Sequence, residues 1–242
     1  MQSMRVARWL LGSLCAFSVG VSKTGVPGLG ILVVPLMVLT VGDARQAAGW
    51  LLPVLCAADV FAVIYWRRHA AARKLFSLAP WVLAGMAIGA AALSLNEQIL
   101  RLGVGVIVLA MLVVHFVRQH FSEVITVPNH PAPYGITAGF ATTVANAAGP
   151  VMNLYLLSKR LSKEEFIATG AWFFFLINLG KVPIYFYHGL ISRQSLYFDL
   201  LMTPAVVFGS VAGRWLVDHI PPKVFEVLVV TLTAVSTLLL FR

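Results

Sequence analysis

Long apolar segments, each near the length at which a helix crosses a bilayer, set what this chain can fold into. Hydrophobic residues make up 60% of its 242 residues, charged residues 11%, and the mean hydropathy is +0.88. A soluble domain of this size has too little interior for so much apolar surface, so we predict an all-α polytopic protein in a lipid bilayer. Six such segments lie at 46–66, 75–95, 99–117, 166–187, 196–217 and 224–241.

The formal net charge of +9 comes mostly from short polar gaps between these segments. The clearest gaps are WRRHAAARK at 66–74 and SKRLSK at 158–163. Because basic loops orient membrane proteins, we interpret the charge as an orientation signal and expect no nucleic-acid partner. The two cysteines, Cys15 and Cys56, have neither disulfide-framework nor zinc-ligand spacing, so we expect no metal. No cofactor is expected either, apart from a coupling proton or ion.

Two further apolar stretches are broken by glycine, proline and polar residues. Residues 8–40 are too long for one span and contain GVSKTGVPGLGILVVP at 20–35; residues 134–157 are broken at NAAGP, 146–150. Each flanking piece has about 12–15 residues, roughly half a bilayer by helical rise. Non-helical chain at membrane depth survives only beside protein or a watery cavity. A kink that serves packing alone is the alternative, but two breaks that both carry polar side chains favour a functional site.

The two breaks belong to an internal repeat. A shift of 121 residues places Gly28 on Gly149, and a shift of 124 places the pattern P-x4-G-x3-G at 80–89 on the same pattern at 204–213. The glycines of that pattern are small-xxx-small pairs, which predict close helix packing. Each repeat would contain a broken or re-entrant helical element followed by three transmembrane helices. We predict an N-terminal repeat 1–121, a linker 122–133 and a C-terminal repeat 134–242.

The orientation of the repeats depends on how the broken elements cross. If each is a re-entrant hairpin, every half crosses three times, the repeats are inverted, and both basic gaps face the cytoplasm. If each crosses fully, the repeats are parallel and SKRLSK faces outward. We expect the inverted arrangement, because it keeps both clusters of lysine and arginine inside.

The breaks also predict an anion site. Beyond the first break a half-helix should start near Gly28, and its free N–H groups carry partial positive charge. Lys23 adds a full charge. Two discontinuous helices whose N-termini meet near the midplane are a recurring binding-site design of secondary transporters. The predicted substrate-binding residues are Ser22, Lys23, Thr24, Gly25, Gly28, Thr143, Asn146, Gly149, Asn153 and Asn178.

Two ionisable residues inside the full spans are candidates for coupling transport to an ion. Asp59 lies about 10 Å deep by helical rise, and it could pair with Lys23 or Lys181 or take up a proton. Pairing alone is the simpler alternative. Lys181 sits near the end of its span and could instead extend to the interface, with Asn178 one turn before it.

The stretch GVSKTGVPGLGILVVPLM at 20–37 resembles the sulfite exporter TauE/SafE family, also called the toluene-sulfonate uptake permease family. Members carry a glycine-rich stretch leading into a VP or LP pair, here Val34-Pro35. Residues 139–186 are similar to the family's C-terminal repeat. Where members commonly have consecutive glycines, this chain has Ser22-Lys23-Thr24, which places a cation in the motif.

This resemblance implies a secondary transporter of the bacterial inner membrane that moves sulfite, sulfonates or sulfoacetate-like anions. Motifs of nucleotide-binding loops, serine hydrolases and zinc proteases are absent from the sequence, so we expect no enzyme. A non-transporting scaffold or an intramembrane enzyme is the alternative, and a channel is disfavoured by the few polar residues in the full spans. Direction of transport, coupling ion and oligomeric state stay open, a homodimer included.

Overall fold

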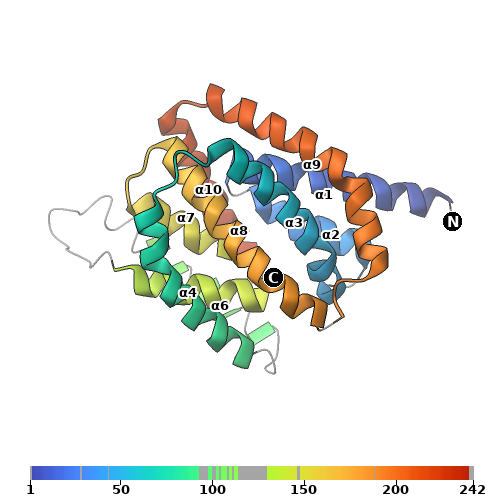
Figure 1. The fold of residues 1–242 in the computed structure, drawn as a ribbon, viewed down its shortest axis with the longest axis horizontal. Coiled ribbons are helices and arrows are strands. Elements are labelled where there is room, and N and C mark those ends of the chain that lie inside the picture. The colour runs from blue at the N-terminus through green and yellow to red at the C-terminus, as the bar shows by residue number, and fades with distance from the viewer. Residues whose placement is uncertain are drawn as a thin grey trace. The chain divides into compact units, whose positions relative to one another are not determined.

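The computed structural model describes residues 2–27, 29–42, 44–92, 130–145, 148–187 and 189–239, with short pieces between 98 and 113. Every regular element in these residues is helical (Figure 1). The predicted span 99–117 is described only in short pieces up to residue 113, and most of the predicted linker 122–133 lies outside the described residues. Gly28 and Asn146, both predicted site residues, lie outside them as well.

The helices follow the apolar pattern of the sequence. From the N-terminus they are α1 (Gln2–Thr24), the 3-10 turn η1 (Leu29–Leu32), α2 (Val33–Val41), α3 (Ala44–Trp66) and α4 (Ala72–Ala92). After the undescribed stretch come α6 (Pro131–Ala145), α7 (Ala148–Ser158), α8 (Lys163–Tyr187), α9 (Arg193–His219) and α10 (Pro222–Leu239).

Four described helices are long and apolar enough to cross a membrane: α3 from Gln46, α4, α8 and α9. This confirms the prediction of an all-α, multi-pass membrane protein.

The described chain forms two compact units. The first unit holds residues 1–70 and 163–225, and the second holds 71–162 and 226–242. Helices α1, α2, α3, α8 and α9 therefore belong to the first unit, and α4, α6, α7 and most of α10 to the second. Each unit contains helices from both predicted repeats, so the units and the predicted sequential repeats are two different divisions of the chain.

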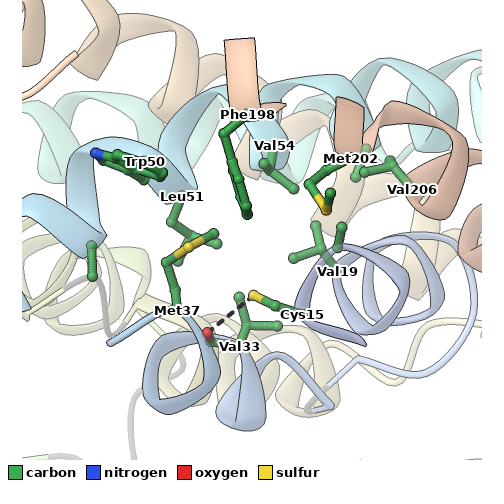
Figure 2. Packing of buried hydrophobic residues seen from close by; sticks show 13 residues of the cluster. Cys15, Val19, Val33, Met37, Trp50, Leu51, Val54, Phe198, Met202 and Val206 are labelled. Carbon is green, nitrogen blue, oxygen red and sulfur yellow. Dashed lines mark hydrogen bonds between the residues drawn. The ribbon is translucent and has the colours of Figure 1, made fainter. Parts of the chain in front are cut away.

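The core of the first unit joins α1, α2, α3 and α9 (Figure 2). Aliphatic, aromatic and sulfur side chains from these helices exclude solvent, and Met37 and Cys15 are fully buried. The Cys15 thiol donates to the carbonyl of Val33 at 3.3 Å, which ties α1 to the start of α2. This packing holds the two helices on either side of the first break in place.

The first break follows from its residues. The N–H groups of Gly25 and Val26 both donate to the carbonyl of Val21, at 3.0 and 3.1 Å, which closes the last turn of α1. Pro27 has no N–H and disfavours helix at the residue before it. Helical structure resumes at Leu29, whose N–H donates to the Val26 carbonyl at 3.3 Å.

Glycines bring α9 against α1, and the two helices lie side by side in Figure 1. A Cβ on Gly209 would overlap the carbonyl oxygen of Phe17, and a Cβ on Gly213 would lie 2.7 Å from that of Val21. Only glycine permits this approach of the two backbones.

The same kind of crossing joins α4 to α6 in the second unit. A Cβ on Gly85 would overlap the carbonyl oxygen of Ile136, and one on Gly89 would lie 3.2 Å from that of Phe140. Both glycine pairs therefore serve close helix packing, as the small-xxx-small pattern predicts.

Candidate functional site

A buried ion pair lies beside the first break. Lys23 stands in the last turn of α1, and its ammonium nitrogen lies 2.7 Å from Oδ1 of Asp59 on α3. The Asp59 side chain is fully buried, whereas that of Lys23 is 11% exposed. A carboxylate this deeply buried requires a partner, since removing one member of a buried pair leaves an uncompensated charge.

A third helix completes the pair. Asn178 on α8 donates its amide to Oδ2 of Asp59 at 2.7 Å. Oδ1 lies within ion-pair distance of the Lys23 ammonium, but the two groups do not have the geometry of a hydrogen bond. One carboxylate therefore links α1, α3 and α8, and the two acceptor atoms have different partners.

Two more residues of α8 shape the surroundings of Lys23. Its ammonium lies 4.1 Å from the centroid of the Phe174 ring, within the range of a cation–π contact. Lys181 is buried, acts electrostatically on both Lys23 and Asp59, and lies 5.9 Å from the centroid of the Tyr185 ring. Lys23 and Lys181 thus both act on the Asp59 carboxylate in this cluster, and Lys23 is the one in direct contact with it.

The end of α1 suits a cation. The last carbonyls of a helix carry partial negative charge, so Lys23 in the last turn is favourably placed. The indole of Trp66 donates to the carbonyl of Thr24 at 2.9 Å, which satisfies one carbonyl that the helix leaves open. Lys23 is therefore held by the C-terminal end of α1 as well as by Asp59.

Three predicted site residues next to Lys23 make structural contacts. The Thr24 hydroxyl lies 3.0 Å from the Gly20 carbonyl and 2.7 Å from that of Ser210 on α9. Gly25 donates its N–H within the turn, and a Cβ on it would overlap the backbone of α9. Ser22 is half-buried, with its hydroxyl 3.2 Å from where a Cβ on Gly30 would lie.

The predicted residues of the second break lie in the second unit. Thr143 donates to the Gly139 carbonyl at 2.9 Å within α6. Asn153 donates to the hydroxyl of Thr233 at 3.1 Å, which joins α7 to α10. A Cβ on Gly149 would meet no described atom within 4 Å apart from its own helix backbone and chain neighbours.

Two contributors escaped sequence reasoning. Phe174 lies in the aromatic run WFFF at 172–175, which is equally typical of a lipid-facing surface. Trp66 stands at a span end, where tryptophan is typical of an interface anchor, yet it is 2% exposed. The guanidinium of Arg214 lies 4.2 Å from the centroid of its ring. No sequence signal distinguishes these roles, because both depend on which helices meet.

Four long apolar helices and a buried ion pair beside a broken helix define a multi-pass membrane protein with a charged internal site. The profile of the sulfite exporter TauE/SafE family matches residues 12–240, and the chain belongs to this family. No curated protein and no solved structure matches the chain. Family membership implies a membrane transporter of sulfur-containing anions and not an enzyme, as the resemblance at 20–37 predicted.

Proposed function

We propose that the protein is a secondary carrier of small sulfur-containing anions, such as sulfite, a sulfonate or a sulfoacetate-like compound. Lys23 provides the positive charge that holds the anion. The observation that carries this assignment is the unequal exposure of the ion pair: 11% for the Lys23 side chain and none for Asp59. An incoming ligand can reach the ammonium before the carboxylate, so the site favours anions over cations.

The surroundings support the same sign of charge. Lys181 adds a second cation to the cluster, and it interacts electrostatically with both members of the pair. Intramembrane cations are costly and are typical of substrate or ion pathways. We assign Asp59 and Lys181 to coupling, and Asn178 to holding the Asp59 carboxylate in place. A bacterial inner membrane is the proposed location.

We also propose that the chain is an internal duplication, whose halves move against each other in alternating access. The two glycine crossings support the duplication, because they use equivalent residues. The glycines of α4 and α9 differ by 124 positions, and the carbonyls they approach on α6 and α1 differ by 119. Two unrelated helix pairs have no reason to share both offsets.

The offset of 119 extends beyond the crossings. It aligns Thr24 with Thr143, and both hydroxyls contact the carbonyl four residues earlier, of Gly20 and Gly139. The first residues of α3 and α8 differ by the same number, which aligns Asp59 with Asn178. A uniform shift of 121 would instead align Ser22 with Thr143. The duplication is thus better described by two offsets than by one.

Flux of radiolabelled sulfite and of a labelled organosulfonate into proteoliposomes tests the carrier. Lys23→Met should lose most of the flux, because the anion loses its counter-charge in a site of low dielectric constant. Lys223→Met is the matched control, since Lys223 lies exposed at the start of α10. Unchanged flux in Lys23→Met would remove the role of this lysine. Absence of flux in the wild-type protein would favour a non-transporting membrane scaffold.

A further inference from the structure

The cation proposed to bind substrate already has an anionic partner. Lys23 contacts Oδ1 of Asp59 at 2.7 Å, and the carboxylate is sealed from solvent. A transported anion must therefore compete with Asp59 for the ammonium. The competitor cannot leave, because it is attached to α3 and its other oxygen is held by Asn178 at 2.7 Å.

We propose that Asp59 is a built-in competitor at the anion site, and that the protein accepts a monoanion that takes the place of the Asp59 carboxylate on Lys23. This inference rests on the proposed function. Binding exchanges one ion pair for another, with no covalent step. Because Lys23 is partly exposed and Asp59 is not, the exchange begins at the ammonium.

A second cation receives the displaced carboxylate. Lys181 on α8 is buried and acts electrostatically on Asp59, and it lies one turn beyond Asn178. When the anion takes Lys23, Asp59 can turn its charge toward Lys181 while Asn178 keeps its contact. After the exchange the bound anion lies opposite Lys23 and Asp59 opposite Lys181, so no buried negative charge is left without a cation.

The charge count selects the class of anion. Within the part of the chain that the structure describes, Lys23 and Lys181 act electrostatically on Asp59, and Lys23, Asp59 and the Cys56 side chain act on Lys181. With a neutral thiol, two lysines and one carboxylate leave one positive charge. One monoanion brings the site to neutrality, whereas a dianion would leave a buried negative charge. Organosulfonates and hydrogen sulfite fit this requirement, and sulfate does not.

Binding to the purified full-length protein tests the competition. The probes are methanesulfonate as monoanion and sulfate as dianion, measured by titration calorimetry in detergent. Asp59→Asn should tighten methanesulfonate binding by about tenfold or more. In the wild type, Lys23 is paired with Asp59 most of the time, and the apparent affinity for methanesulfonate is reduced in proportion to the small fraction of molecules in which Lys23 is unpaired. Asp218→Asn is the matched control: this carboxylate pairs with Arg214 one turn away on α9 at an exposed position, and its removal should change nothing.

The outcomes separate this inference from the proposed function. If wild-type protein binds methanesulfonate and Asp59→Asn binds it equally or more weakly, the competitor is refuted and the carrier stands. If neither protein binds methanesulfonate, sulfite or any other sulfur-containing anion, the proposed function fails and the inference fails with it. Sulfate binding as tight as methanesulfonate binding in the wild type would overturn the monoanion selection.

A measurement on the wild-type protein covers the case in which Asp59→Asn does not fold. Infrared difference spectra with carboxyl-¹³C aspartate should show a shifted carboxylate band when methanesulfonate saturates the site. The shift should be absent in Lys23→Met and retained in Asp218→Asn. An unchanged aspartate band in wild-type protein at saturation would overturn the exchange.

Discussion

Lys23 combines two placements that each stabilise a cation inside a membrane protein. It lies in the last turn of α1, where the open carbonyls carry partial negative charge, and it contacts Asp59 at 2.7 Å. Neither placement covers it completely, because its side chain stays 11% exposed. A buried ion pair contributes little net stability compared with an apolar replacement, so its position beside a helix break supports the proposed role in transport.

Asn178 is the residue that sets the position of the Asp59 carboxylate. Asn178→Leu has a similar volume but no amide, and it leaves Oδ2 buried without its donor. We expect the free energy of unfolding to fall by about 1–3 kcal/mol, the cost of an unsatisfied buried acceptor. Titration with SDS, followed by circular dichroism, measures the change.

The control for this variant is Leu179→Ala, at an exposed position one residue along α8. A surface truncation of this kind should change the free energy of unfolding by less than about 0.5 kcal/mol. Equal stability of wild type and Asn178→Leu would mean that the amide does not anchor Asp59.

At the scale of the element, the end of α1 depends on a residue from another helix. Trp66 closes α3 and donates its indole N–H to the Thr24 carbonyl at 2.9 Å, and it also stacks with Arg214. Trp66→Phe should lower the unfolding free energy by about 0.5–1.5 kcal/mol for the lost hydrogen bond. It should also lower transport, because the turn that carries Lys23 loses its tether.

Trp215→Phe provides the comparison, since Trp215 on α9 is 61% exposed. We expect this variant to keep wild-type stability and flux within the error of the SDS titration and the proteoliposome assay. A Trp66→Phe variant that behaves like Trp215→Phe would show that the tether is dispensable.

The two glycine crossings make a second prediction for elements. Gly85→Ala and Gly209→Ala should both destabilise, because each added Cβ would overlap a backbone carbonyl that cannot move alone. Overpacking of this kind costs about 1–3 kcal/mol. Gly180→Ala should be neutral or stabilising, since that Cβ would meet no described atom within 4 Å beyond its own helix, and alanine favours helix.

Melting of the three purified variants by intrinsic fluorescence ranks them against wild type. Similar losses for Gly85→Ala and Gly209→Ala agree with equivalent roles in a duplicated fold. A large loss in one variant alone would argue against that equivalence.

At the scale of the whole molecule, the inverted arrangement predicts that both basic gaps face the cytoplasm. Single cysteines at Arg68 and Arg160, in a background without Cys15 and Cys56, report the two gaps separately. In intact cells a membrane-impermeant maleimide should label neither position, and both should react after permeabilisation. Labelling at position 160 in intact cells would indicate parallel repeats.

The sequence alone determined the class of protein and the position of its first break. Apolar segments of spanning length predict α3, α4, α8 and α9. Lipid offers no hydrogen-bond partners, so the backbone groups of such segments must be satisfied within a helix. The end of α1 at Thr24 follows from local chemistry, since Gly25 and Pro27 act on their own backbone. The motif at 20–37 likewise identified the family that residues 12–240 match.

Only the tertiary structure decided which polar residues meet. The sequence offered Lys23 and Lys181 as alternative partners of Asp59, and the fold places Lys23 in direct contact while Asn178 supplies the second donor. Asp59 and Asn178 stand 119 residues apart, and no local rule relates them. The pairing depends on how α1, α3 and α8 pack, and that packing is set by side-chain shape and close glycine contacts summed over many helices.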